Sequence, residues 1–393
     1  MPGSLTRQLP GLLLAAVMLP ALVTSCSPRT QPSEPSSKAE SSGATTAAGA
    51  PVDPVCEQLA ALPLRDKLAQ LVMVGVRDAA DARAVVTDHH VGGIFIGSWT
   101  ELSILTDGSL KEIAGTDGLL PLAVSVDEEG GRVSRLSKLI GPSPSAKELA
   151  ATRSVTQVRE LAAERGRKMA ELGITVDFAP VVDVVDAGTD DETVIGDRSF
   201  GSDPAKVTEY AGAYAQGLRD AGLLPVLKHF PGHGHGSGDS HTAGAVATPP
   251  LAQLQDNDLV PYRTLVSQEP VAVMLGHLEV PGLTEDPASL SPAAVNLLRT
   301  GTDYHGPAFS GLVFTDDLSS MAAITEHYGV AEAVLRSLAA GVDIALWVTT
   351  DDVPAVLDRL EQAVAAGELK QEGIDASLAR VAAVKKPGTH CQR

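Results

Sequence analysis

The sequence predicts a (β/α)8 barrel, and three observations support this fold class. Eight short runs of β-branched and other apolar residues recur after residue 60. They are almost continuously hydrophobic, as is typical of parallel strands that are covered on both faces. Segments with helical periodicity lie between most of these runs, and such an alternation favours a closed parallel barrel. A doubly wound open sheet is the alternative, but no GxGxxG motif follows the first run.

The positions of the apolar runs define the predicted strands. They are 71–76 (LVMVGV), 91–96 (VGGIFI), 121–127 (PLAVSVD), 175–184 (TVDFAPVVDV), 225–230 (PVLKHF), 271–277 (VAVMLGH), 311–316 (GLVFTD) and 342–348 (VDIALWV). Three of the helical segments between them end at a glycine, where a left-handed C-terminal cap belongs: 155–173, 204–222 and 331–341.

The N-terminus has the pattern of a lipoprotein signal peptide. Arg7 precedes the apolar stretch GLLLAAVMLPALV, which is too short for a comfortable membrane span. The following VTSC resembles a bacterial lipobox, so we expect residues 1–25 to be removed and Cys26 to be lipid-modified. An ordinary secretory signal with a chance cysteine is the alternative. The predicted location is the outer face of the cytoplasmic membrane, or the cell envelope.

Residues 26–52 form a predicted flexible tether between Cys26 and a single catalytic domain at 53–393. The tether is rich in Ser, Ala, Pro, Gly and Thr and cannot bury enough apolar surface to fold. Cys56 and Cys391 lie at the two ends of the predicted domain. In an oxidising compartment they are candidates for a disulfide, although two free thiols remain possible.

The net charge of −19 argues against nucleic-acid binding, which needs a basic surface. We expect a monomer whose partners are a small-molecule substrate and, through Cys26, the membrane.

Polar side chains end several predicted strands. Because active sites of such barrels lie at the carboxyl ends of the strands, these residues should converge. They are Asp127, Asp183, Lys228, His229, His277 and Asp316.

Asp316 is the candidate nucleophile, because a carboxylate at the barrel mouth can attack an anomeric carbon. The neighbouring Asp317 suits an N-cap for a helix beginning at LSSMAAI. Asp127, Arg135 and Arg198 are candidate ligands for sugar hydroxyl or carbonyl oxygens, since carboxylates and guanidinium groups bind these well.

The stretch KHFPGHGHGSGDSH (228–241) follows the fifth strand and is dense in glycine, as expected of a mobile loop. Asp239 can orient His241 and stabilise its charged form, which would give a general acid/base. An alternative is that His233, His235, Asp239 and His241 bind a metal ion. The spacing does not match a tighter H-x-H-x-D-H arrangement, so we expect no metal and no other cofactor.

The sequence resembles the glycoside hydrolase family 3 β-N-acetylglucosaminidases of the NagZ type. The motifs DEEGGRVSR, DFAPVVDV, IGDRSF, KHFPGHG, DSH, FTDDLSSM and AGVDIAL carry this resemblance and occur in the family's order. His235 and a serine in the loop depart from the family's pattern.

The resemblance implies hydrolysis with retention of anomeric configuration and without a metal. Asp316 would form the covalent glycosyl-enzyme, and His241 would be the acid/base with Asp239 as its partner. Asp127, Arg135, Arg198, Lys228 and His229 would bind the GlcNAc ring.

We therefore expect an exported, retaining exo-β-N-acetylglucosaminidase that acts on cell-wall (peptidoglycan-derived) fragments or muropeptides. A metal-dependent hydrolase and a non-catalytic sugar-binding lipoprotein are the alternatives.

Overall fold

The computed structural model describes residues 53–116 and 118–391. The predicted signal peptide, the predicted tether and Cys26, the predicted site of lipid modification, lie outside these residues. In the described part of the chain, no helix has the length and apolar character needed to cross a membrane.

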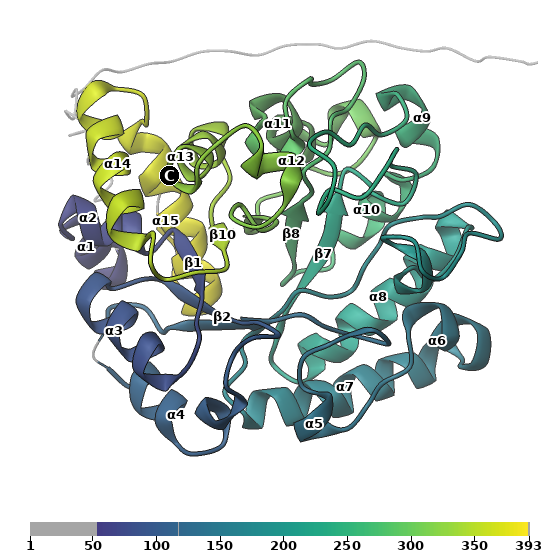
Figure 1. The fold of residues 1–393 in the computed structure, drawn as a ribbon, viewed down its shortest axis with the longest axis horizontal. Coiled ribbons are helices and arrows are strands. Elements are labelled where there is room, and N and C mark those ends of the chain that lie inside the picture. Colours follow the sequence, from purple (N-terminus) through teal and green to yellow (C-terminus); the bar gives the residue numbers. More distant parts are fainter. Residues whose placement is uncertain (1–52, 117, 392–393) are drawn as a thin grey trace, which may run out of the picture. The chain divides into compact units, whose positions relative to one another are not determined.

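Eight parallel strands form the central sheet, and each of them overlaps one predicted run (Figure 1). In the order in which they pair, they are β10 (Ala345–Trp347), β1 (Val72–Gly75), β2 (Gly93–Ile96), β3 (Ala123–Val126), β6 (Val176–Asp177), β7 (Leu224–Phe230), β8 (Ala272–Leu275) and β9 (Val313–Thr315). A parallel bridge between Phe314 and Ile344 joins β9 to the start of β10, and the Thr315 N–H donates to the Ile344 carbonyl at 3.1 Å. The sheet is therefore closed, and the predicted (β/α)8 barrel is confirmed.

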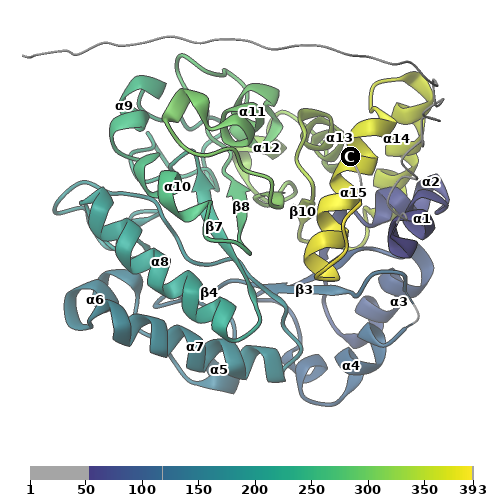
Figure 2. The same cartoon turned by 180° about the vertical axis from the view of Figure 1, so that it is seen from behind.

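Helices surround this sheet, and the long pair α7 and α8 lies side by side on its outside (Figure 2). The predicted helices at 155–173, 204–222 and 331–341 correspond to α7, α8 and α13, with ends that agree within two residues. The helices are α1 (Pro54–Ala60), α2 (Leu64–Ala69), α3 (Ala79–His89), α4 (Ser109–Ala114), α5 (Ser137–Ile140), α6 (Ala146–Thr152), α7 (Val155–Glu171), α8 (Pro204–Asp220), α9 (Leu251–Asp256), α10 (Val260–Leu265), α11 (Pro292–Thr300), α12 (Ala322–Thr325), α13 (Val330–Ala340), α14 (Val353–Ala366) and α15 (Gln371–Lys385).

Three phenylalanine rings pack against one another inside the barrel. The ring centroid of Phe178 lies 5.8 Å from that of Phe95 and 5.5 Å from that of Phe314. Because side chains alternate between the two faces of a strand, residues two positions further along face the interior as well. Gly97 after β2 and Asp316 after β9 therefore face the space above these rings, at the carboxyl end of the barrel.

The fourth predicted strand, 175–184, is much shorter in the structure than in the prediction. Only Val176–Asp177 are paired as β6, followed by an isolated bridge from Val181 to Lys228. Pro180 interrupts the ladder because proline has no N–H to donate. Asp183 consequently lies in an irregular, buried segment beyond the strand.

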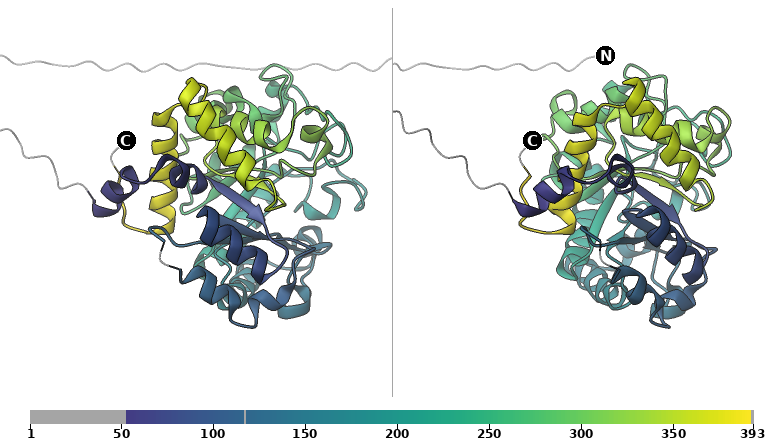
Figure 3. Two further views of the ribbon diagram at one scale, coloured as in Figure 1. Left: turned by 60° about the vertical axis from the view of Figure 1, so that its left-hand side comes forward. Right: turned by 90° about the vertical axis from the view of Figure 1, so that its left-hand side faces the viewer.

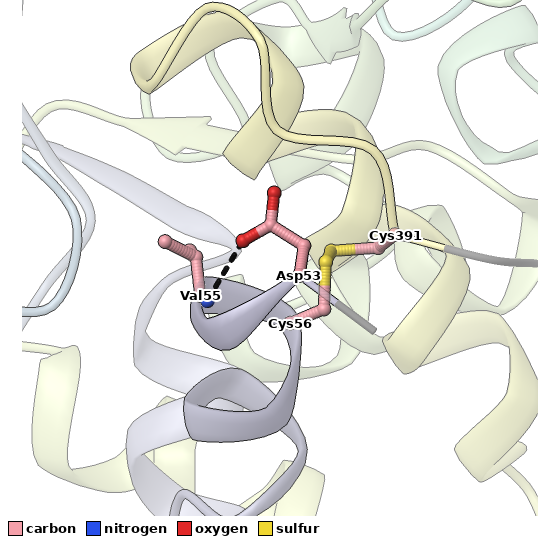
Figure 4. Close-up of a disulfide and its surroundings, with 4 residues drawn as sticks. All are labelled: Asp53, Val55, Cys56 and Cys391. Atoms are coloured by element: carbon pink, nitrogen blue, oxygen red, sulfur yellow. Dashed lines mark hydrogen bonds between the residues drawn. A yellow bond between two sulfur atoms is a disulfide. The ribbon is translucent and has the colours of Figure 1, made fainter. Parts of the chain in front are cut away.

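The first and last described segments lie next to each other, as the purple and yellow ribbons in Figure 3 show. Asp53 caps α1 by accepting a hydrogen bond from the Val55 N–H at 2.9 Å. A disulfide joins Cys56 in α1 to Cys391, across a sequence separation of 335 residues (Figure 4).

Candidate active site

A cavity of about 310 Å³ opens at the carboxyl end of the barrel. This volume is at the small end of the range for ligand pockets and suits a single sugar ring. The cavity is lined by all eight candidate catalytic and sugar-binding residues, namely Asp127, Arg135, Arg198, Lys228, His229, Asp239, His241 and Asp316, together with Glu129, Arg132, Val133, Glu192, Thr193 and Val194.

Two buried cations and two carboxylates form one network on the cavity wall. Lys228 Nζ lies 2.6 Å from Asp127 Oδ1 and 2.7 Å from Glu129 Oε1. Arg198 binds both oxygens of Glu129, at 2.8 and 2.9 Å. Burial opposes the charged form of Lys228, but Asp127 and Glu129 raise the pKa of its ammonium group. The network fixes the directions in which Asp127, Arg198 and Lys228 can meet a ligand.

Glu129 is the residue of this network that the sequence analysis missed. Its side chain is almost fully buried. Burial alone would raise the pKa of the carboxyl, but Arg198 and Lys228 hold it well below the ordinary value. Glu129 follows Asp127 by two positions in DEEGGRVSR, so both side chains leave the backbone on the same side. This two-residue spacing is the feature of the sequence that could have identified Glu129 as a second carboxylate on the same side as Asp127.

His229 is held by a buried carboxylate behind it. Its Nδ1 lies 2.7 Å from Asp183 Oδ2, and Asp183 Oδ1 accepts the backbone N–H groups of His229 and His233 at 3.1 and 2.8 Å. Nε2 of His229 lies 3.4 Å from Arg198 Nη2 and 3.9 Å from Asp316 Oδ2. Asp183 therefore positions the imidazole so that Nε2 faces the site.

The Asp316 side chain is about 20% exposed and faces this cationic wall. Burial alone would raise the pKa of its carboxyl, but His229, His277 and Lys228 lower it to about 2. The carboxylate is therefore ionised at any physiological pH, as a nucleophile requires. His277 supports the backbone beside it, because its Nε2 lies 2.7 Å from the Asp317 carbonyl oxygen.

The predicted helix cap at Asp317 is wrong in its location. The Asp317 carboxylate accepts the N–H groups of Ser319 and Ser320 at 2.8 and 3.1 Å, which is the bonding pattern of a cap. However, these residues form a turn, and α12 begins only at Ala322. Asp317 therefore stabilises the turn that follows the candidate nucleophile.

Asp239 and His241 form a pair at the cavity entrance. His241 Nδ1 lies 2.7 Å from Asp239 Oδ1, and the same oxygen accepts the His241 N–H at 2.9 Å. Burial would raise the pKa of Asp239, but the hydrogen bonds from His241 lower it. The loop docks on the segment after β9, because the His241 carbonyl accepts the Ala322 N–H at 3.3 Å. The loop that carries the pair is therefore attached to the chain segment that follows Asp316.

Arg135 also lines the cavity. Its Nε is buried without a hydrogen-bond partner among the described residues. The cavity therefore includes the Arg135 side chain, whose predicted role as a ligand for a sugar oxygen stays a prediction.

The histidines proposed as metal ligands bind separate partners instead. His233 Nε2 lies 3.1 Å from Ser240 Oγ, and His235 Nδ1 lies 2.8 Å from Asp258 Oδ1. Within 53–116 and 118–391, no group of three or more His, Cys, Asp or Glu side chains is arranged to hold a metal ion. The glycine-rich loop turns each side chain toward a different neighbour, so close spacing in sequence does not bring them together.

A larger cavity, of about 970 Å³, lies at the opposite end of the barrel. It is lined by the beginnings of the strands, by α15 and by Pro387–Cys391. None of the candidate catalytic residues reaches it. We assign the chemistry to the smaller cavity because the titratable groups converge there.

Known proteins resemble this chain over most of its length. Residues 63–384 match the sequence profile of the glycosyl hydrolase family 3 N-terminal domain. Beta-hexosaminidase LpqI of Mycobacterium tuberculosis is 66% identical over 379 residues, which cover 95% of this chain and 96% of that protein.

Solved structures show the same relationship. A family 3 glycosyl hydrolase from Mycobacterium smegmatis is 72% identical with a TM-score of 0.82, covering 84% of this chain and 99% of that one. A family 3 β-N-acetylglucosaminidase from Paenibacillus sp. is 34% identical with a TM-score of 0.75, covering 83% of this chain and 62% of that one.

Proposed function

Because this chain belongs to glycosyl hydrolase family 3, we propose that it is a retaining exo-β-N-acetylglucosaminidase. The main support for this proposal is that the Asp316 carboxylate and the Asp239–His241 pair line the same cavity as Lys228 and Arg198. The names of the relatives support the β-hexosaminidase activity and a GlcNAc-containing substrate. Peptidoglycan-derived fragments or muropeptides are the substrates that we propose, because an exported enzyme meets the cell wall.

In the first step, the Asp316 carboxylate attacks the anomeric carbon and the bond to the leaving oxygen breaks. His241 donates its proton to that oxygen, while Asp239 accepts from Nδ1 and stabilises the imidazolium. In the second step, neutral His241 takes a proton from water, and the hydroxide displaces Asp316. A neutral base avoids the repulsion that a second carboxylate would exert on an anionic nucleophile.

The ring-binding residues hold the sugar during both steps. Asp127, Arg135 and Arg198 bind hydroxyl and carbonyl oxygens, and Lys228 and His229 complete the wall behind them.

Release of 4-nitrophenol from its β-GlcNAc, β-glucose and β-xylose glycosides tests this function. We expect selectivity for β-GlcNAc, a β-configured first product by NMR, and no effect of chelators. Asp316→Ala should lose nearly all turnover. Activity lost on chelation would favour a metal-dependent hydrolase, and tight GlcNAc binding without turnover would favour a non-catalytic sugar-binding protein.

The acid/base assignment has its own test. His241→Ala should slow hydrolysis of natural saccharides by about 10²–10⁴-fold, since their leaving groups need protonation. Activated aryl glycosides should be affected much less in the glycosylation step. Equal losses on both substrates would contradict the role of His241 as the acid.

We also propose that the protein is exported and anchored through Cys26, and that it is a monomer. The lipobox-like VTSC supports the anchor. Wild-type protein should partition with membranes and take up labelled palmitate, whereas Cys26→Ala should do neither. Light scattering of the soluble domain should give the mass of one copy.

A further inference from the structure

One large aromatic side chain at the barrel mouth has no role in the mechanism above. The Trp99 side chain is 44% exposed, whereas Trp347, the other tryptophan of the sequence, is fully buried. Trp99 and Leu139 are the exposed large hydrophobic residues of the described chain. A single exposed apolar residue is ordinary on a protein surface, so its exact position decides whether Trp99 has a function.

The Trp99 indole covers glycines that face the barrel interior at the carboxyl ends of the strands, the end at which the candidate site lies. Parallel pairing aligns Ile96 with Val126, so Gly97 and Asp127 follow as neighbours at the ends of β2 and β3. Gly97 faces the interior, two residues beyond Phe95. The benzo edge of Trp99 covers this glycine, since a Cβ at Gly97 would lie 2.4 Å from the ring atoms Cζ2 and Cη2.

A second glycine, Gly75, also packs against the Trp99 ring. A Cβ on Gly75, at the end of β1, would lie 2.8 Å from Trp99 Cζ2. The barrel thus carries Gly75 as the last residue of β1 and Gly97 directly after β2, whereas Asp127 and Asp316 directly follow β3 and β9, and Lys228 lies within β7. The indole occupies the interior space that side chains at these two strand ends would otherwise fill.

Hydrogen bonds hold the turn that carries Trp99. Thr100 Oγ1 accepts the Gly97 N–H at 3.0 Å and donates to the Val76 carbonyl at 2.6 Å. The Phe95 ring meets the indole edge-on, with a centroid distance of 5.8 Å. A ring held in this way loses little conformational entropy when a ligand packs on it.

We propose that Trp99 is the stacking platform for the leaving-group sugar, one ring beyond the GlcNAc that is cleaved. This inference rests on the proposed function. Trp99 is not among the residues that line the 310 Å³ cavity, but it covers Gly97. Gly97 follows Ile96, which pairs with Val126, the residue before the cavity-lining Asp127. Trp99 therefore borders the mouth, where the aglycone leaves. The apolar C–H face of a pyranose packs well on a half-exposed indole.

Kinetics on two substrates test this platform. One is the β-1,4-linked GlcNAc disaccharide. The other is methyl β-N-acetylglucosaminide, whose leaving alcohol has similar basicity but carries no ring. Trp99→Ala should lower kcat/KM roughly tenfold on the disaccharide, mainly through KM, and far less on the methyl glycoside. Trp99→Phe should keep most of the disaccharide activity, and Leu139→Ala should change neither substrate.

A double-mutant cycle tests whether the absence of a side chain at Gly97 positions the Trp99 ring. Gly97→Ala should displace the indole and reproduce the disaccharide defect, but it should add little in the Trp99→Ala background, where the new methyl group has room. Equal losses on both substrates would assign Trp99 a purely structural role. An unchanged disaccharide KM in Trp99→Ala would overturn the proposal. Wild-type protein that hydrolyses neither substrate would instead refute the proposed function itself.

Binding gives a readout that does not depend on turnover. In Asp316→Asn, the fluorescence of half-exposed Trp99 should shift when the disaccharide binds and change much less with GlcNAc alone. A disaccharide titration without any shift, at concentrations that saturate the site, would contradict stacking.

Discussion

Two opposing electrostatic effects determine the pKa of the Asp316 carboxyl group. Burial disfavours its charge, whereas His229, His277 and Lys228 favour it, and the balance lowers the pKa to about 2. A carboxyl group whose pKa is lowered in the folded protein remains ionised until the pH falls through that value. If Asp316 is the nucleophile, as we propose, its ionisation should not limit activity in mildly acidic solution.

A substrate that needs no acid catalyst isolates this property. For the 2,4-dinitrophenyl β-GlcNAc glycoside, kcat/KM reports attack by Asp316, and we expect it to be nearly constant between about pH 4 and pH 8. For the methyl glycoside, kcat/KM should vary with pH, since protonation by His241 is required. An acidic limb with a midpoint near pH 5 for the dinitrophenyl glycoside would contradict the lowered pKa of Asp316.

The residue types at the site follow from the sequence, but their partnerships do not. Asp127, Lys228 and Asp316 stand at strand ends, which a hydrophobic pattern can locate. Glu129 and Asp183 act through contacts with residues 99 and 46 positions further along the chain, Lys228 and His229 respectively. Only closure of the barrel brings those pairs together, so these partnerships could not be read from local spacing.

At the level of elements, Glu129 ties three segments of the barrel mouth together. It lies in β4 (Glu128–Gly130), which pairs with β5 (Val133–Ser134) as a short hairpin after β3. Its two oxygens bind Lys228 from β7 and Arg198 from the 3-10 helix η2 (Gly196–Arg198). The hairpin, β7 and the long loop after β6 are thus joined by one carboxylate.

Glu129→Gln should weaken both stability and binding. Two buried cations would remain without their shared anion, and breaking such a buried pair costs about 3–5 kcal/mol. We expect a lower midpoint in urea unfolding and a raised KM for the aryl glycoside.

Glu112→Gln is the matched control for Glu129→Gln. Glu112 pairs with Arg83 on the surface, where both side chains are largely exposed, so the change should cost less than about 1 kcal/mol. Equal unfolding midpoints for the two variants would show that the Glu129 network does not stabilise the fold.

The glycine-rich loop directs its closely spaced histidines to separate partners. His235 bonds to Asp258 beyond α9, and His233 bonds to Ser240 within the loop. These two hydrogen bonds hold the loop in a conformation in which Asp239 and His241 line the cavity. His235 thus attaches the loop to the segment after α9 through Asp258.

Across the whole molecule, the disulfide links the two ends of the described domain. Cys56 and Cys391 close a loop that contains the entire barrel. A cross-link stabilises mainly by restricting the unfolded chain, and the effect grows slowly with loop length. Cys391 lines the cavity at the amino ends of the strands, at the other end of the barrel from Asp316.

The double variant Cys56→Ser/Cys391→Ser should lose about 2–5 kcal/mol of stability and keep its kcat/KM on the aryl glycoside. Thermal unfolding followed by circular dichroism, with and without reductant, measures the change. Reductant should lower the Tm of the wild type toward that of the variant. A variant Tm equal to that of the oxidised wild type would show that the link contributes no stability.

The sequence by itself determined the fold class, the positions of the eight strands and the eight candidate catalytic and sugar-binding residues that line the cavity. These follow from local patterns, because continuous apolar runs specify buried parallel strands and their ends specify the mouth of the barrel. The tertiary structure alone decided which charges neutralise one another, where Asp317 acts, and that Trp99 rests on Gly75 and Gly97 beside Asp127. Such contacts join distant segments, and their geometry exists only once the closed sheet has fixed the register of its strands.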